Sequence, residues 1–172
     1  FEEVFAYILA GQISRAQHDA EIALRVEFSE EIAKQFTEAL PFELTPAQKK
    51  SAWEILQDVN KEVPMNRLLE GDVGSGKTAV AAFAAFMAAR QGVQTAFMAP
   101  TELLARQHAQ TLANLLEPLG VRIALLTSAV KGKAKTTLKE QLKNGAVDIV
   151  IGTHALLQES VAFHRLGFIV VD

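Results

Sequence analysis

A glycine-rich octapeptide limits this chain to a small set of folds. It consists of Gly71, Asp72, Val73, Gly74, Ser75, Gly76, Lys77 and Thr78. The run fits G-x-x-x-x-G-K-[ST], the pattern of a loop that wraps a phosphate chain. Its glycines let backbone N–H groups turn toward an anion, while Lys77 can reach the β- and γ-phosphates and Thr78 can hold Mg²⁺. Such a loop connects a strand to a helix, so it predicts an α/β fold.

The residues on either side of the octapeptide agree with that fold. Arg67–Leu69 precedes it and predicts a short buried strand, and the alanine-rich residues 78–90 predict a helix packed on a sheet. The N-terminus of this helix would point at the loop and add a partial positive charge there. The alternative is a glycine-rich turn that only opens a structural helix.

Strands and helices alternate through the rest of the chain. Strands are predicted at residues 94–98, 122–126, 147–151 and 168–171, and helices at 102–116 and 134–143, with a short helix after Thr153. Strands that are apolar on both faces and alternate with helices form a parallel sheet covered on both sides. The expected fold class is therefore α/β, with the phosphate-binding loop at the C-terminal end of the first strand.

Residues 1–40 predict an α-helical leader. Apolar residues recur at helical spacing within 4–9 and again within 32–40, where Ser29 is a candidate N-cap, and Pro41 ends the run. Another helix is expected after Thr45, with Pro46 at its first position. The leader carries eight acidic and three basic side chains (net −5), whereas residues 41–172 carry twelve acidic and fourteen basic (net +2).

Composition sets the outer limits. The chain has no cysteine, so it has no disulfide framework and no thiolate metal site, which is compatible with a cytoplasmic protein. Its most apolar stretch, residues 79–89, is too short to span a bilayer, so no membrane association is expected. The chain starts without Met and stops on an apolar strand at Asp172. We expect it to be a fragment of a longer protein.

Two further residues have candidate roles in nucleotide chemistry. Asp172 follows an apolar strand, which is the Walker-B position of a carboxylate that binds Mg²⁺ together with Thr78. The alternative is that Asp172 only caps the next helix. Gln48 can both donate to and accept from an adenine edge, but it also lies three residues after Thr45, which predicts a capping box. The spacing alone favours the cap.

Two polar loops follow strands at the same edge of the predicted sheet. Pro100, Thr101 and Glu102 come after one strand, and Thr153 and His154 come after the next strand but one. Each loop alone is typical of an ordinary helix start, and a single histidine is more often structural than catalytic. Together the two loops favour contact with a phosphate backbone.

A run of lysines follows the strand at 122–126. It consists of Lys131, Lys133, Lys135, Lys139 and Lys143. Such a run is usually a solvated face, although a nucleic-acid backbone could also use it. No aromatic residue interleaves it to stack on bases.

The order of these segments resembles a known family. They read FELTPAQ, MNRLLEGDVGSGKT, APTELLARQH, LLTSAVKGK, DIVIGTHALL and FIVVD. From about residue 40 onward they resemble the first motor domain of superfamily 2 helicases, most closely the RecG family that remodels replication forks and branched DNA. The transcription-repair coupling factors share GDVG-GKT and DIVIGTH and are the second choice. RecG sequences commonly have Thr-Gly-Ser where this chain has Thr127, Ser128 and Ala129.

The resemblance implies a role for each candidate residue. It implies nucleotide contacts at Gln48 and residues 71–78, catalytic roles for Lys77 and Asp172, metal binding at Thr78 and Asp172, and DNA contacts at Pro100, Thr101, Glu102, Thr153 and His154. It implies ATP and Mg²⁺ as cofactors and forked or branched DNA as a partner. Residues 1–40 would join a preceding wedge domain to residues 41–172, the N-terminal part of a RecA-like ATP-binding domain.

The resemblance also implies parts that this sequence does not contain. A glutamate after Asp172 and a second motor domain with an arginine finger complete the family's site, so we expect this chain to bind Mg-ATP weakly and to hydrolyse it negligibly. A GTPase would need Asn-Lys-x-Asp, but Asn60 and Lys61 are followed by Glu62 and Val63. No transporter-type LSGGQ signature is present. A nucleotide-dependent binding module without motor activity stays open.

Overall fold

The computed structural model describes residues 22–172, so the helix predicted within residues 4–9 lies outside the described part. The described chain forms the helices α2 (Glu30–Ala39), α3 (Pro46–Val59), α4 (Lys77–Ala89), α5 (Glu102–Leu116) and α6 (Gly132–Lys143), the strands β1 (Gln94–Met98), β2 (Ile123–Leu126), β3 (Ile149–Gly152) and β4 (Leu166–Val171), and the 3₁₀ turns η1 (Glu117–Leu119) and η2 (His154–Leu157).

The four strands form one parallel sheet in the order β2-β3-β1-β4. This confirms the predicted α/β class with a parallel sheet. Parallel strands need crossover connections, and here α5 links β1 to β2 and α6 links β2 to β3. The carboxyl ends of all four strands therefore lie along one edge, where sheets of this kind place their ligand sites.

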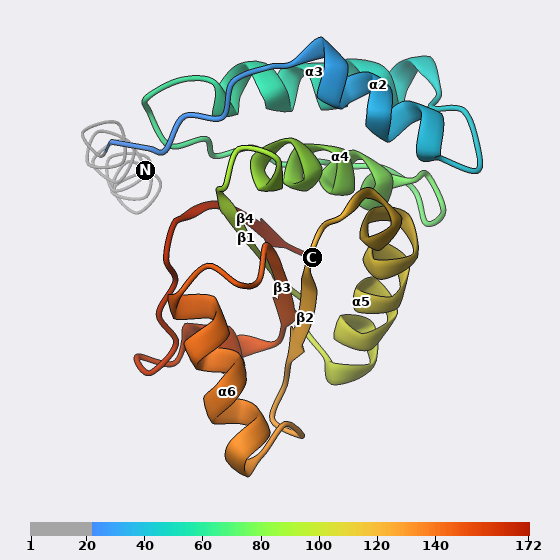
Figure 1. The fold of residues 1–172 in the computed structure, drawn as a ribbon. Coiled ribbons are helices and arrows are strands. Elements are labelled where there is room, and N and C mark those ends of the chain that lie inside the picture. The colour runs from blue at the N-terminus through green and yellow to red at the C-terminus, as the bar shows by residue number, and fades with distance from the viewer. Residues whose placement is uncertain (1–21) are drawn as a thin grey trace, which may run out of the picture.

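Successive residues of β1, β2 and β3 face two different hydrophobic cores. Phe97 of β1 and Ile149 of β3 belong to the larger core, which α2, α3, α4 and α5 also build. Ala96 and Val150 belong to a smaller core on the opposite face, closed by Leu142 of α6 and its neighbours. Figure 1 shows α2 and α3 stacked on α4, with α6 apart from them at the lower left.

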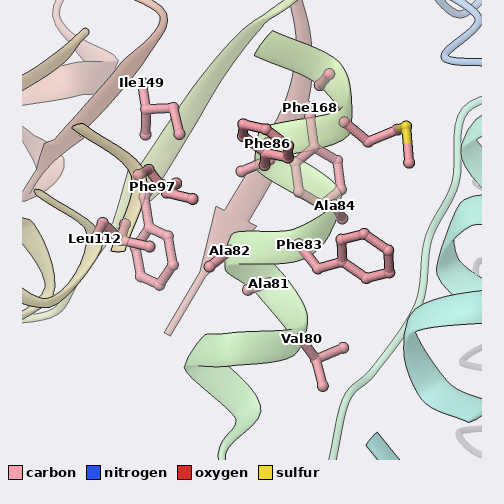
Figure 2. Close-up of a cluster of buried hydrophobic side chains, with 14 of the residues drawn as sticks. Val80, Ala81, Ala82, Phe83, Ala84, Phe86, Phe97, Leu112, Ile149 and Phe168 are labelled. Carbon is pink, nitrogen blue, oxygen red and sulfur yellow. The ribbon is translucent and has the colours of Figure 1, made fainter. Parts of the chain in front are cut away.

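Helix α4 is buried on every side. All residues from 79 to 88 are buried, because the sheet covers one face of the helix and α2 and α3 cover the other. Phe36 of α2 packs against Phe83 and Phe86 at ring-centroid distances of 4.9 and 5.8 Å. Figure 2 shows Phe97 and Phe168 of the sheet close to the same helix. The core thus holds the end of the phosphate-binding loop rigidly through α4.

The buried side-chain amide of Gln94 links α6 and the segment before β3 to the residues just before β4. Gln94 is 4 % exposed, and its Nε2 donates to the carbonyls of Leu142 and Val147 at 3.0 and 2.7 Å. Its Oε1 accepts from the backbone N–H groups of His164 and Arg165 at 2.8 and 2.9 Å. Both N–H groups of the amide and both lone pairs of its oxygen therefore have hydrogen-bond partners, as burial of an amide requires.

Two predictions about secondary structure are wrong. Residues 67–69 form neither a strand nor a buried segment: they do not pair with β4, which lines the same hollow, and Leu68 is 79 % exposed. Residues 22–29 are not helical. Their backbone instead donates from Ala23 to Glu62 and from Val26 to Val59, at 2.8 and 2.9 Å, so the segment runs along the end of α3.

The described part of the leader packs onto the rest of the chain. Ser29 caps α2 as predicted, and Val26 and Phe36 are each 1 % exposed in the larger core. The boundary expected at residue 40 stays a prediction. Within residues 22–172, no helix is both long and apolar enough to cross a bilayer.

Candidate nucleotide site and adjoining loops

The phosphate-binding loop has the backbone shape that its glycines predict. Gly76 caps α4 with φ 81° and Gly74 has φ 82°, a region that other residues rarely adopt. A Cβ on Gly76 would also lie 2.3 Å from the side-chain nitrogen of Gln48. The loop therefore turns directly into the N-terminus of α4, whose free N–H groups favour an anion.

Lys77 lies inside the curve of this loop. Its Nζ donates to the carbonyls of Gly71 and Asp72 at 2.6 and 2.9 Å. The ammonium is thus already at the mouth of the loop, where it would meet the phosphates of a nucleotide. Thr78 follows on the first turn of α4 and is half-buried.

Gln48 makes the capping box and also contacts the phosphate-binding loop. Its Oε1 accepts from the backbone N–H of Thr45 at 2.8 Å, while Thr45 Oγ1 accepts from the backbone N–H of Gln48 at 3.2 Å. Its Nε2 donates to the carbonyl of Ser75 at 2.8 Å. The predicted cap is confirmed, and the contact with adenine stays a prediction. The link to Ser75 holds the N-terminus of α3 against the loop.

A hollow of about 360 Å³ brings the expected chemistry together. Lys77 and Thr78 line it from α4, and Asp172 lines it from the end of β4. A threonine hydroxyl and a carboxylate are oxygen donors of the kind that Mg²⁺ takes, with water and phosphate supplying its other ligands. The donors present therefore fit this ion, and within the described residues no cluster of three or more acidic, histidine or cysteine side chains competes for it.

Sequence analysis did not single out His108, which contacts Asp172, the carboxylate expected to bind Mg²⁺. Nε2 of His108 on α5 lies 2.7 Å from Oδ2 of Asp172, and the His108 ring packs on Phe97 at 4.7 Å. The side chain of His108 is only 13 % exposed. The sequence feature that could have indicated His108 is its place in APTELLARQH, two helical turns after Thr101, on the helix that follows β1.

A second missed residue fixes the segment that enters the phosphate-binding loop. Arg67 donates to Asp58 Oδ2 from Nε and Nη2 at 2.9 and 2.6 Å, and to Glu54 Oε2 from Nη1 at 2.9 Å. Hydrogen bonds from Lys61 and Arg67 hold the pKa of Asp58 below its ordinary value of 3.8, although burial opposes them. The hydrogen bond to Asp58 likewise raises the pKa of Arg67. These contacts with α3 replace the strand pairing that the segment lacks.

The two polar loops predicted at the sheet edge lie side by side. Ala99 donates to the carbonyl of Gly152 at 2.8 Å, which joins the loop after β1 to the loop after β3. Thr101 caps α5 and accepts from the N–H of Leu104, and Glu102 pairs with Arg106 at 2.7 Å. Pro100 and Thr101 are exposed.

The loop after β3 offers one exposed and one buried candidate. His154 is exposed, whereas Thr153 is 8 % exposed and caps η2 through Oγ1, which accepts from Ala155 at 3.5 Å. Asp172 belongs to the same edge, because its N–H donates to the carbonyl of Met98 at 2.9 Å. The structure thus places the nucleotide candidates and the loop candidates along one edge, while their roles stay predictions.

These features are those of a helicase motor domain. The family model of the DEAD/DEAH box helicases matches residues 45–172, so the chain belongs to the DEAD/DEAH box helicase family. Within it, the predicted similarity to RecG is confirmed. The chain is 45% identical over 173 residues to the ATP-dependent DNA helicase RecG of Staphylococcus aureus strain NCTC 8325 / PS 47, covering 100% of this chain and 25% of that protein.

Further relatives agree. RecG of Staphylococcus epidermidis strain ATCC 12228 / FDA PCI 1200 is also 45% identical, again over 100% of this chain and 25% of its own length. The chain thus spans about a quarter of the length of the curated relatives it matches. A solved structure of RecG bound to a three-way DNA junction superposes with a TM-score of 0.90 and 43% identity, covering 98% of this chain and 23% of that one.

A more distant structure shares the fold alone. A hypothetical ATP-dependent RNA helicase from Sulfolobus tokodaii has a TM-score of 0.56 and 24% identity, covering 78% of this chain and 38% of the other.

Proposed function

We propose that this chain forms the nucleotide-binding part of an ATP-dependent DNA helicase or translocase that remodels branched DNA, such as stalled forks and junctions. The observation that supports this most is the shared sheet edge. Lys77, Thr78 and Asp172 line one hollow there, and the loops after β1 and β3 adjoin it. The RecG bound to a three-way junction, at 43% identity, supports branched DNA as the substrate.

In this proposal each residue has the role expected from the sequence, because its position in the structure supports that role. Residues 71–78 hold the phosphates of ATP, with the Lys77 ammonium moving from the Gly71 and Asp72 carbonyls onto phosphate oxygens. Mg²⁺, when bound, neutralises phosphate charge and is held by Thr78 and Asp172. Gln48 reads adenine with the donor and acceptor capacity that the cap leaves free. Pro100, Thr101, Glu102, Thr153 and His154 contact the DNA backbone.

We also propose that other parts of the polypeptide complete the motor. Residues 41–172 would be the N-terminal part of a RecA-like domain, and residues 1–40 its link to a wedge domain. A second motor domain would close on the nucleotide and supply an arginine finger, which contributes roughly 10³–10⁵ in rate to enzymes of this class. Opening and closing of the two domains would then move the exposed loops along DNA.

The test is Lys77→Ala in the full-length protein that carries this chain. Loss of the ammonium removes a phosphate contact, so DNA-stimulated ATP hydrolysis should fall by roughly a hundredfold or more. Binding to a forked duplex should stay within a few-fold of wild type, because Lys77 lies in the hollow and not on the exposed loops. Lys49→Ala, on the outer face of α3, is the matched control and should leave both properties unchanged. Parallel loss of fork binding and hydrolysis in Lys77→Ala would contradict this division of roles.

A further inference from the structure

Four lysines form a regular stripe along α6. Lys131, Lys135, Lys139 and Lys143 recur every four residues, and the fifth lysine of the segment, Lys133, lies on another face. Four residues of helix rise by about 6 Å, so Lys135, Lys139 and Lys143 repeat along the helix backbone at that interval, and Lys131 lies at the N-cap just before them. This interval is comparable with the spacing of successive phosphates along one nucleic-acid strand.

The charge of this lysine stripe is not neutralised within the described chain. Residues 131–143 contain five lysines and one glutamate, a net of +4, whereas the whole chain has a net charge of −3. Among residues 22–172, none of these lysines forms an ion pair, while Lys34, Lys50 and Lys61 each do. Lys135 and Lys139 donate only to neutral groups, Gln158 Oε1 at 3.2 Å and Ser160 Oγ at 2.5 Å.

This arrangement works against the stability of α6 itself. Like charges four residues apart on a helix repel each other, and cations near its first turn oppose the helix dipole. Helices α2 and α5 follow the usual rule, with Glu30 and Glu31 in the first turn of α2 and Glu102 in the first turn of α5, whereas α3 and α4 have no acidic residue there. Within the described residues, α6 has no acidic residue in its first turn and no side-chain cap.

The stripe continues the row of loops at the sheet edge. Met98 of β1 and Leu126 of β2 both pair with Gly152 of β3, so the loops after these three strands lie next to one another. The loop after β2 leads directly into Lys131 and α6. The hydrogen bonds from Lys135 and Lys139 then fix the stripe against residues 158–160, just past η2. Glu159 in that segment lowers the local net charge only from +4 to +3.

We propose that the lysine stripe of α6 is a binding surface for a nucleic-acid phosphate backbone, which extends the strand path from the loops after β1 and β3 onto the outer face of α6. This proposal rests on the proposed function, because it takes DNA as the partner. The stripe contacts phosphates and not bases, since no aromatic side chain interleaves it. It therefore adds affinity and salt dependence without sequence preference.

The experiment measures binding of the full-length protein to a fluorescein-labelled oligothymidine and to a labelled forked duplex over a series of KCl concentrations. The stripe variant replaces Lys131, Lys135, Lys139 and Lys143 by Gln. The control variant replaces Lys34, Lys49, Lys50 and the exposed Arg90 by Gln, which changes the net charge equally but away from α6. Circular dichroism shows that both variants are folded.

Each lysine that contacts a single strand contributes roughly 0.7 to the slope of log affinity against log salt. The stripe variant should therefore lower the slope by about 3 and weaken binding at least roughly tenfold at low salt, while the control variant stays close to wild type. If the quadruple variant does not fold, Lys131→Gln with Lys143→Gln tests the same surface, with an expected fall in slope of about 1.4.

Three outcomes would overturn the proposal. Equal slopes for stripe and control variants mean that the lysines are a solvated face, and the proposed DNA motor is then unaffected. A stripe variant that loses binding to vesicles of anionic lipid but keeps DNA binding assigns the surface to another partner. Failure of the wild-type protein to bind either DNA at low salt contradicts both this inference and the proposed function.

Discussion

His108 connects α5, which follows one of the exposed loops, to Asp172 at the end of β4. It lies on α5, which follows the exposed loop of Pro100 and Thr101, and its Nε2 lies 2.7 Å from Oδ2 of Asp172. This contact leaves Oδ1 of Asp172 free of described hydrogen bonds from side chains within residues 22–172. We therefore infer that His108 is a positioning residue for the carboxylate of Asp172, which lines the hollow together with Thr78.

We predict that His108→Ala weakens the Mg²⁺-dependent part of ATP binding roughly fivefold, which corresponds to about 1 kcal/mol for one lost hydrogen bond. His108→Gln should restore most of the loss, because its amide can still donate to Asp172. Titration of a fluorescent ATP analogue with and without Mg²⁺ measures this difference, and the exposed neighbour Gln107→Ala is the control. Tighter Mg-ATP binding in His108→Ala would show instead that the histidine competes with the ion.

The elements show which parts of the fold the sequence can predict. Periodicity located β1 and α5 with their observed bounds, because each is a regular element with a clear apolar pattern and, for α5, a threonine cap. It failed for residues 67–69, where a buried strand was predicted but Leu68 is 79 % exposed and the segment has no strand to pair with. Pairing of segments far apart in sequence is not visible in local patterns.

The candidate site likewise contains features that the sequence predicts and contacts that it does not. The phosphate-binding loop and the cap formed by Gln48 follow from short-range spacing, so the sequence alone could find them. The contacts of His108 with Asp172 and of Arg67 with Asp58 join residues 64 and 9 positions apart, and depend on how the helices pack. The sequence can point to His108 through its place in APTELLARQH, but without packing information it does not show which residue His108 or Arg67 contacts.

The clamp of Arg67 on α3 predicts how the entry segment responds to pH. The pKa of Asp58 is lower in the folded chain than its ordinary value of 3.8, chiefly because of the hydrogen bond from Lys61 and then that from Arg67. The stabilisation is therefore fully present above that ordinary value and is lost as the pH falls through the lower pKa of the folded state. Removing the carboxylate should abolish this part of the pH dependence.

We expect Asp58→Asn to be less stable than wild type near neutral pH and to approach wild type as the pH falls toward about 2. Urea unfolding between about pH 2 and pH 7 measures the difference. Glu43→Gln is the control, because Glu43 is exposed and forms no ion pair within residues 22–172. A stability gap for Asp58→Asn that stays constant across this range would show that the clamp acts through packing and not through charge.

At the scale of the whole molecule, the hollow contains the groups that we propose bind a nucleotide but, among the described residues, few that would hydrolyse it. Within the described residues, the only carboxylate that lines it is Asp172, which His108 already holds, and the only arginine that lines it is Arg67. Glu54 and Asp58 hold that arginine on the α3 side. Among the described residues that line the hollow, the remaining cation is Lys77, which we propose is engaged with the phosphates, so no carboxylate base and no second cation is left free there.

We therefore predict that the isolated 172-residue chain binds Mg-ATP weakly and hydrolyses it negligibly, with no stimulation by DNA. The measurement is phosphate release with and without forked DNA, beside equilibrium binding of a fluorescent ATP analogue. Lys77→Ala in the isolated chain should abolish the analogue's binding while leaving the background phosphate release unchanged, which separates a bound but unreactive nucleotide from a failure to bind. DNA-stimulated turnover by the isolated chain would mean that its own residues supply the base and the cation, because no other part of the polypeptide is present. Arg67 would then have to leave Glu54 and Asp58 during the reaction, and Arg67→Lys, which keeps the charge but not the forked contacts, would lower that turnover.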